Sequence, residues 1–351
     1  MSRALDKHVI AALKQGDHQK IFNEIAGLFE NPHDERLLEI EILGRSHPIS
    51  PDENFLRDDN AVAVPKLRLV QAFVVARQIL QNHLADGTVG AGKLWLATGV
   101  LLLMDPEHLT AANTRKRLLR SEMPAGGDVR SALMQEKWFV DSLLTSRLHR
   151  HTKSPTLWSH RRWLLERFRE LGLPVAIQQD VEAVIMIAGE RHPRNYYAWG
   201  HARWLTKTFD TVFSSEDIFP LIQSVKRWSF RHHTDISGWS FLAHLLGESR
   251  SNFDNQVFSS VFKETLDLAE SLRWENESVW WFLRTTASIT AMGQAGLEQF
   301  INVQEKLSAA APVDSTGFRV LSAARKWCDM YGPHGDGVTP NALEQSYEIE
   351  A

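Results

Sequence analysis

Residues 151–165 read His-Thr-Lys-Ser-Pro-Thr-Leu-Trp-Ser-His-Arg-Arg-Trp-Leu-Leu and begin with the signals that start a helix. Ser154 is a preferred N-cap residue, because its side-chain oxygen can accept a hydrogen bond from an otherwise unpaired amide of the first turn. Pro155 follows at the first helical position, where a missing N–H has no cost. The stretch therefore predicts a helix that starts at Pro155 and carries Trp158 in its first turn or just past it.

This helix start recurs along the chain with an almost constant period. The repeated Trp residues lie 41, 40 and 41 residues apart, at Trp158, Trp199, Trp239 and Trp280. Four positions before them stand preferred N-cap residues, which are Ser154, Asn195, Asp235 and Asn276. A degenerate earlier copy spans residues 105–115, with Ala112 where Trp is expected. Self-similarity at a fixed period is the signature of a repeat protein.

Each repeat also has room for a second helix. Residues 177–188 carry apolar side chains at helical spacing upstream of the Asn195 cap. Two helices and two short connections form an antiparallel hairpin, and stacked hairpins bury what each cannot bury alone. The sequence therefore predicts an all-α fold, an α–α superhelix (solenoid) of antiparallel helical hairpins with a crescent shape. The repeated Trp residues, with Trp163 and Trp204 as their second-turn partners, are interpreted as structural core rather than an isoprenoid-binding surface.

The rest of the chain divides around this array. Residues 1–90 form an N-terminal helical and loop region, with short helices up to residue 46, a loop over 46–65 and a long helix over 67–83. The repeats occupy residues 91–330, beginning with a helix over 93–104. Residues 331–351 are poor in apolar side chains and are expected to form a mobile tail.

Composition excludes several function classes. The 39 basic and 43 acidic residues give a net charge of -4, whereas a general nucleic-acid binder is more often basic. The one cysteine, Cys328, excludes a disulfide framework and a Cys-based zinc site within the chain. The N-terminus lacks the apolar core of a signal peptide. The longest apolar stretch, Leu94 to Met104, covers 11 residues, against about 20 for a transmembrane helix. We therefore expect a cytoplasmic protein without a transmembrane segment.

The residue pattern within the repeats, rather than their period, distinguishes them from HEAT or armadillo repeats. Residues 151–165 resemble the repeat of protein prenyltransferase α subunits, which reads Pro-Lys-[Asn or Ser]-Tyr-x-x-Trp-x-His-Arg-x-Trp-[Val or Leu]-Leu. Residues 194–205 and 276–284 are similar to later repeats of that family. The resemblance covers about residues 94–290, and it is greatest to the α-type subunit of the type III geranylgeranyltransferase.

The resemblance implies a subunit of a heterodimeric enzyme that is inactive without its β subunit. Such an enzyme transfers a geranylgeranyl group from a prenyl diphosphate to a C-terminal Cys of a protein substrate. The family places zinc in the β subunit, so no cofactor is expected in this chain. The type III enzyme pairs with the β subunit of Rab geranylgeranyltransferase and modifies a SNARE protein, and the same partner and substrate class are implied here.

Lys153 is the residue that the resemblance assigns to catalysis. It aligns with the family's lysine one residue before the cap, which reaches the diphosphate. Independently of the family, an ammonium beside a helix N-terminus can face the same anion as the positive end of the helix dipole. The diphosphate-facing and substrate-facing candidates that follow one repeat later are Arg194, Asn195, Tyr196 and Tyr197. A solvated surface lysine at Lys153 and a plain N-cap role for Asn195 remain the alternatives.

Basic residues concentrate around these candidates. Residues 147–169 hold seven basic residues and one acidic residue, and residues 191–207 hold four basic residues and no acidic one. Arg161 is interpreted as a structural cation–π and salt-bridge partner of the repeat. The histidines recur at fixed offsets from the repeat Trp, so the periodic fold explains them and no metal site is predicted.

A second function class remains open. The chain could be a non-catalytic helical-repeat adaptor or scaffold that kept the fold without the chemistry. Tyr197, which stands where farnesyltransferase α subunits have His, and Ala202, which replaces a repeat Arg, favour this alternative. The retained Lys153, Arg194 and Asn195 argue against it.

Overall fold

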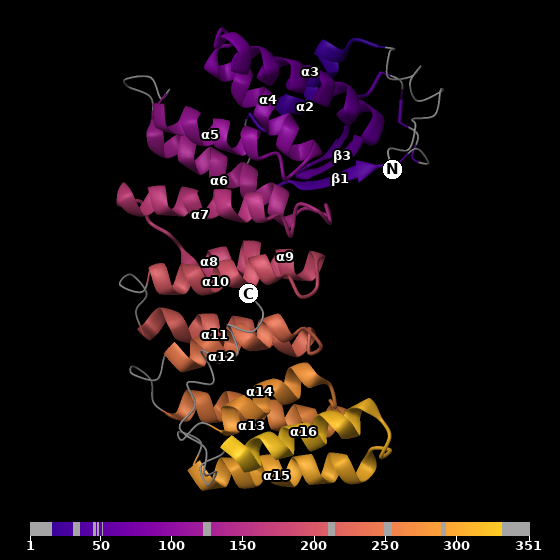
Figure 1. The fold of residues 1–351 in the computed structure, drawn as a ribbon, viewed down its shortest axis with the longest axis vertical. Helices are drawn as coiled ribbons and strands as arrows, with labels where there is room; N and C mark the ends of the chain where they lie inside the picture. Colours follow the sequence, from indigo (N-terminus) through magenta and orange to yellow (C-terminus); the bar gives the residue numbers. More distant parts are fainter. Residues whose placement is uncertain are drawn as a thin grey trace. The chain divides into compact units, whose positions relative to one another are not determined.

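The computed structural model describes residues 16–30, 36–44, 47, 49–50, 52–121, 128–209, 215–248, 255–288 and 293–331. The chain forms two compact units, residues 1–201 and 202–351, which divide within helix α10 (Tyr196–Thr208). Both units are mostly helical, as predicted (Figure 1). The crescent-shaped superhelix stays a prediction. The predicted tail, apart from Tyr331, lies outside the described residues.

A small sheet in the N-terminal region corrects the all-α prediction. After helix α2 (His18–Gly27) come three strands, β1 (Glu39–Leu43), β2 (Leu56–Asp58) and β3 (Ala61–Pro65). Their order is β1-β3-β2, with β1 parallel and β2 antiparallel to β3. Residues up to 46 were expected to be helical and residues 46–65 to be a loop. Residues 39–42 instead alternate Glu and Ile, a period of two that is typical of a strand with one buried face.

Two serines at the end of helix α6 (Val129–Thr145), Ser142 and the C-cap Ser146, form hydrogen bonds with the backbone at the outer edge of the sheet. The Leu38 amide donates to Ser142 Oγ at 3.0 Å, and the Ile40 amide donates to Ser146 Oγ at 3.0 Å. The Ser146 hydroxyl donates in turn to the Leu38 carbonyl at 3.2 Å. Serine hydroxyls therefore take the place of a further strand beside β1, which leaves these backbone groups paired.

The helices of the first unit follow one another as adjacent antiparallel pairs (Figure 1). They are α3 (Lys66–Asp86), α4 (Ala91–Met104), α5 (Leu109–Ser121), α6, α7 (Pro155–Glu170), α8 (Ile177–Asp180), η1 (Val181–Ile185) and α9 (Met186–Arg191). The predicted helices over 67–83 and 93–104 are confirmed as α3 and α4. The predicted helical segment over 177–188 is also confirmed, although η1 inserts one π-helical stretch into it.

The four predicted N-caps are confirmed by their hydrogen bonds. Backbone amides of the first turn donate to side-chain oxygens at 3.1, 3.2, 2.9 and 3.2 Å, on Ser154, Asn195, Asp235 and Asn276 respectively. The degenerate first copy is capped by His108, whose Nδ1 accepts from the Ala111 amide at 3.2 Å. His108 stands four residues before Ala112, so the spacing of the repeat holds even where its Trp is missing.

The second unit continues the helical pattern. It contains α11 (Ser215–Arg231), α12 (Ile236–Glu248), α13 (Asn255–Leu272), α14 (Glu277–Ala287), α15 (Gly293–Ala310) and α16 (Thr316–Tyr331). Trp228, Trp239 and Trp280 are at most 1% exposed and fill its core. Gly238 allows the close approach of α11 and α12, since a Cβ there would lie 2.5 Å from a ring carbon of Trp228.

Candidate functional site

Three turns of the first unit lie side by side, and they precede α5, α7 and α10. The Ser154 hydroxyl donates to the Pro106 carbonyl at 3.1 Å, which joins the first turn to the second. Asn195 Nδ2 donates to the Thr152 carbonyl at 2.7 Å, which joins the second turn to the third. The rings of His149 and His192 also contact each other between the second and third turns, with centroids 4.6 Å apart and ring planes inclined by 36°. Candidate residues from separate repeats are thereby held on one face.

The repeat Trp fixes the turn before α7. Trp158 Nε1 donates at 2.9 Å to the carbonyl of Thr152, six residues earlier. The same bond to the sixth preceding residue recurs in the second unit, from Trp239 at 3.0 Å and from Trp280 at 2.7 Å. The turn that carries Lys153 is therefore tied to the buried core by an indole, and Trp158 itself is only 4% exposed.

Lys153 is exposed at the start of α7. It directly precedes Ser154, which is buried and caps the helix. Among the described residues, no carboxylate lies within ion-pair distance of its ammonium. The side chain is therefore available to an anion, next to the positive end of the α7 dipole.

Arg194 holds the corresponding position before the cap of α10 and is also exposed. Its backbone is left-handed, with φ of 57°, a conformation that costs a non-glycine residue about 1 kcal/mol or more. The strain is retained because Asn195, the next residue, is held on both sides. Lys153 and Arg194 thus occupy equivalent places in two turns that contact each other.

Asn195 is buried, and chain groups occupy both ends of its amide. Its oxygen caps α10, while its nitrogen donates to Thr152 and, at 3.3 Å, to the Ala188 carbonyl. Tyr196 and Tyr197 differ from it, because they are 62% and 42% exposed and their rings meet edge to face at 5.6 Å. In this arrangement Asn195 positions the turn, and the two tyrosines are the groups presented to solvent.

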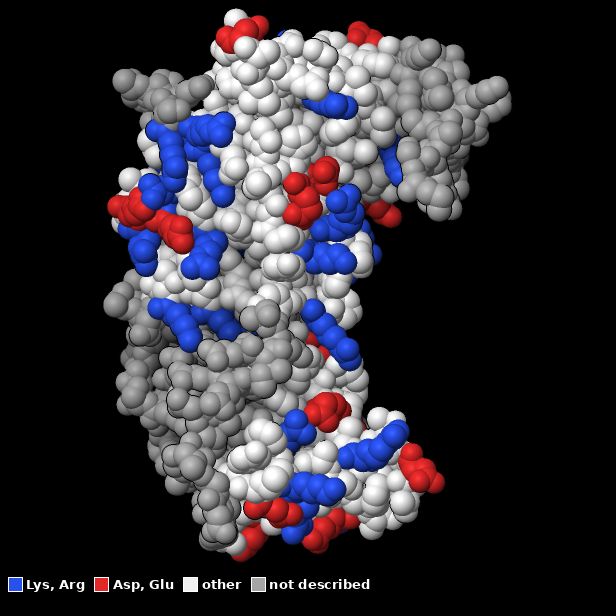
Figure 2. All heavy atoms as spheres, in the orientation of Figure 1, with Lys and Arg blue, Asp and Glu red and all other residues white. Residues whose placement is uncertain are grey.

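The face around these turns is positively charged. Lys and Arg side chains gather over the turns before α7 and α10, on the right-hand side of Figure 2. Arg147 and Arg150 are exposed beside Lys153, with Arg150 Nη2 paired to Asp105 at 3.0 Å. Arg191 Nη2 lies 3.8 Å from Glu39 Oε2. The arrangement can bind an anionic group between two fixed turns.

Comparison with known proteins identifies the repeat in this part of the chain. Residues 142–168 match the protein prenyltransferase alpha subunit repeat, and residues 157–266 match the ECM9 middle domain. A 73-residue stretch is 38% identical to the protein prenyltransferase alpha subunit repeat-containing protein 1 of Danio rerio. That stretch covers 21% of this chain and 15% of the Danio rerio protein.

Residues 142–168 are thus similar to a protein prenyltransferase α-subunit repeat. The matched residues 142–168 include Lys153, its cap and Trp158.

The prenyltransferase repeat buries an arginine three residues after its Trp position. Arg161 is fully buried, with Nε 2.7 Å from Asp141 Oδ1 and Nη2 3.0 Å from Asp180 Oδ2. Burial alone would lower the pKa of Arg161, but the two carboxylates outweigh it and raise the pKa. Burial raises the pKa of Asp180, yet Arg161 and Lys137 hold that pKa below its usual value. Arg161 is therefore part of an internal charge network, and the next residue, Arg162, is exposed.

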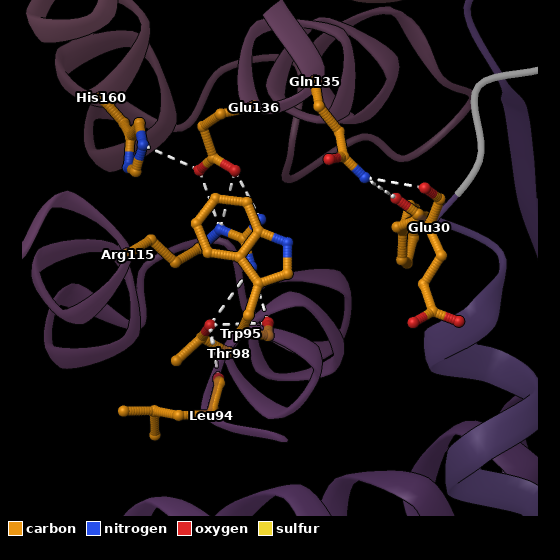
Figure 3. A network of polar contacts seen from close by, with 9 residues as sticks. Glu30, Leu94, Trp95, Thr98, Arg115, Gln135, Glu136 and His160 are labelled. Carbon is orange, nitrogen blue, oxygen red and sulfur yellow. Dashed lines mark hydrogen bonds and ion pairs between the residues drawn. The ribbon is translucent and has the colours of Figure 1, made fainter. Parts of the chain in front are cut away.

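One repeat earlier the same position is filled by Arg115 (Figure 3). Its guanidinium pairs with the buried carboxylate of Glu136, which His160 Nε2 also approaches at 3.0 Å. Arg115 Nη1 donates to the Trp95 carbonyl at 2.8 Å. Burial raises the pKa of Glu136, but Arg115 and His160 outweigh it and hold the pKa below its usual value. Each network thus ties two repeats together.

The remaining repeat Trp residues lie in or beside the core. Trp199, Trp239 and Trp280 are at most 1% exposed, whereas Trp204 is half-buried against Phe209. Sequence reasoning missed the contact between the rings of His149 and His192, whose signal was a spacing of 43 residues, the same as that of Thr152 and Asn195. It also missed the carboxylate partners of Arg161, which no local pattern marks.

Metal-binding clusters and membrane-spanning helices are both absent from the described ranges. No group of three or more His, Cys, Asp or Glu side chains among the described residues could hold a metal ion. None of the helices in those ranges combines the length and hydropathy that a bilayer span requires.

Proposed function

We propose that this chain is the α-type subunit of a heterodimeric protein prenyltransferase that transfers a geranylgeranyl group to a C-terminal Cys of a protein substrate. The observation that carries the proposal is the pair of cations, Lys153 and Arg194, at equivalent positions of two turns that contact each other. The proposed partner is a prenyltransferase β subunit such as that of Rab geranylgeranyltransferase, and a SNARE protein is the proposed substrate class. We place the complex in the cytoplasm.

In this proposal Lys153 acts on the leaving group. Negative charge grows on the diphosphate as the prenyl bond breaks, so a fixed cation lowers the barrier to transfer. Lys153 needs little reorganisation, because Ser154 and Trp158 hold its turn. Arg194 supplies a second cation, and the exposed Tyr196 and Tyr197 lie where a substrate or the partner would pass.

The partner supplies what this chain is not expected to hold. A zinc ion in the β subunit would activate the substrate thiol as a thiolate. The residues of this chain bind and orient the diphosphate, and the buried caps keep the two turns in register. The chain alone is therefore expected to be inactive.

The proposal is tested with the purified heterodimer. Lys153→Ala is expected to lower turnover with geranylgeranyl diphosphate about tenfold or more, since each ~1.4 kcal/mol of lost transition-state stabilisation lowers the rate about tenfold. Arg169→Ala, an exposed basic residue at the other end of α7, is the matched control and should leave turnover unchanged. Gel filtration should show normal assembly of the heterodimer for both variants. Full activity of Lys153→Ala would remove the assigned role.

A non-catalytic adaptor is the second candidate. The departures from the family pattern at Tyr197 and Ala202 favour it, and so does the internal satisfaction of the Asn195 amide. Co-expression with prenyltransferase β subunits separates the two functions. A stable complex that transfers a prenyl group supports the enzyme, whereas failure to bind any β subunit together with capture of other partners supports the adaptor.

A further inference from the structure

A second basic cluster lies at the opposite end of the hairpins, where α5 and α7 finish. Three cations surround the indole of Trp163. Lys116 Nζ lies 5.8 Å, Arg120 Cζ 5.3 Å and Arg167 Cζ 6.0 Å from its ring centroid. We call these four residues the Trp163 cluster. Lys and Arg side chains also gather over these helix ends on the left-hand side of Figure 2.

The Trp163 cluster is short of negative charge. No carboxylate among the described residues forms an ion pair with Lys116 or Arg120. Arg167 pairs with Glu170, and the neighbouring Glu166 pairs with Arg162 at 3.4 Å. Burial, followed by the charge of Arg120, lowers the pKa of Lys116, while the charge of Glu166 opposes this shift. Two cations are therefore held close together, and neither forms an ion pair with a carboxylate of the described residues.

Trp163 also has an unused donor. The residue is only 9% exposed, and its Nε1 has no acceptor among the described residues. The Nε atom of Arg167 is likewise buried without an acceptor. Buried indole N–H groups normally find a partner, so both donors call for an acceptor oxygen that this part of the chain does not provide.

Structural roles account for part of this arrangement. Cations near a helix C-terminus compensate the helix dipole, and a cation over an indole is stabilised by the ring. Neither role uses the N–H of Trp163 or the Nε of Arg167, and neither requires Lys116 and Arg120 beside each other. An oxyanion with several acceptor atoms can pair with Lys116 and Arg120 and offers an acceptor oxygen to the neighbouring N–H groups.

We propose that the Trp163 cluster is a binding site for a phosphate group. Several donors around one ring suit a compact anion with several oxygens better than the spaced carboxylates of an acidic peptide. The phosphate could come from a lipid headgroup or from a soluble phosphate ester. This inference does not depend on the proposed prenyltransferase function, because Lys153 lies at the other end of α7.

The two phosphate sources can be separated with the full chain. Co-sedimentation uses phosphatidylcholine vesicles with and without phosphatidylinositol bisphosphate, and calorimetry uses soluble inositol trisphosphate. Binding to phosphoinositide vesicles alone assigns the lipid source, and binding to the soluble ester assigns a general phosphate site. Binding to neither, or displacement by a polyglutamate peptide as readily as by inositol trisphosphate, would overturn the proposal.

Variants test which residues form the site. The Lys116→Gln, Arg120→Gln double variant is expected to weaken phosphate binding about tenfold or more. Trp163→Phe keeps a ring in place but removes the N–H, and it should weaken binding about threefold without loss of the cooperative thermal transition. Lys93→Gln, at an exposed lysine near the start of α4, is the control and should bind as the wild type does. Unchanged phosphate binding in the double variant would contradict the assignment.

Discussion

At the scale of single residues, the chain uses buried charges to join its repeats. Arg115 and Arg161 stand three residues after the Trp position of successive repeats, and both are almost fully buried. Each is held by carboxylates that lie 19 to 21 residues away in the sequence. A buried ion pair adds little to stability compared with apolar residues of similar size, but removing one partner leaves the other charge uncompensated.

Replacement of Arg161 is therefore expected to be costly. Arg161→Met should lower the free energy of unfolding by about 3–5 kcal/mol, because Asp141 and Asp180 would share only Lys137. Urea denaturation monitored by circular dichroism measures the change in the free energy of unfolding. Arg162→Ala is the matched control, since Arg162 is exposed and its loss should change stability by about 0.5 kcal/mol or less. Equal effects of the two substitutions would contradict the structural role of Arg161.

At the scale of elements, Asn195 both caps a helix and connects two neighbouring turns. Its oxygen starts α10, and its nitrogen holds the turn of the preceding repeat at Thr152. Asn276 has a similar arrangement in the second unit, where Nδ2 lies 2.9 Å from Nδ1 of His233. Both bonds span 43 residues, so the cap is also a connector between neighbouring hairpins.

This double task predicts a graded response to substitution. Asn195→Ser keeps a cap oxygen but loses the donated bonds, and it should lower the free energy of unfolding by about 1 kcal/mol. Asn195→Ala loses both tasks and should cost about 2 kcal/mol. Urea denaturation measures both values, and Ser154→Ala is a comparison that also loses a cap and one bond to a neighbouring turn. An alanine variant no less stable than the serine variant would show that the cap contributes nothing.

The helices could be predicted from the sequence because their signals are local. Each N-cap and the Trp four residues later lie within about one turn, and the place of Lys153 follows from Ser154. The alternation of Glu and Ile over residues 39–42 is a local signal for strand β1, but its edge bonds to Ser142 and Ser146, more than 100 residues away, could not be predicted. The contact of the Lys153 and Arg194 turns likewise depends on a bond between residues 43 positions apart.

At the scale of the whole molecule, both units bury neutral histidines. Burial lowers the pKa of His151 to about 4, although Nε2 lies 3.1 and 3.0 Å from the Leu102 and Leu103 carbonyl oxygens. Burial, with Arg203 and Lys207, lowers the pKa of His244 to about 4. Burial and the charge of Arg161 hold the pKa of His201 well below its usual value. Protonation of these rings is therefore disfavoured in the native state.

The sign of the resulting pH dependence follows from linkage. An unfolded histidine titrates near pH 6.5, so between about pH 6.5 and pH 4 the unfolded chain binds more protons than the folded one. The free energy of unfolding should fall as the pH decreases through this window, with His151 alone contributing about 3 kcal/mol. Below about pH 4.5 the lowered pKa of Glu136 and of Asp180 adds to the loss, since these carboxylates are stabilising only when ionised.

Thermal unfolding at a series of pH values checks this dependence. The melting temperature should change little above pH 7 and fall between pH 6.5 and pH 4. His151→Gln keeps a donor near the Leu102 carbonyl but cannot titrate, so it should lose less stability than the wild type between pH 7 and pH 5. His149→Gln, at an exposed histidine, should follow the wild type. Equal losses of stability by His151→Gln and the wild type over this range would contradict the prediction. The pH dependence would then not come from burial of the neutral His151 ring.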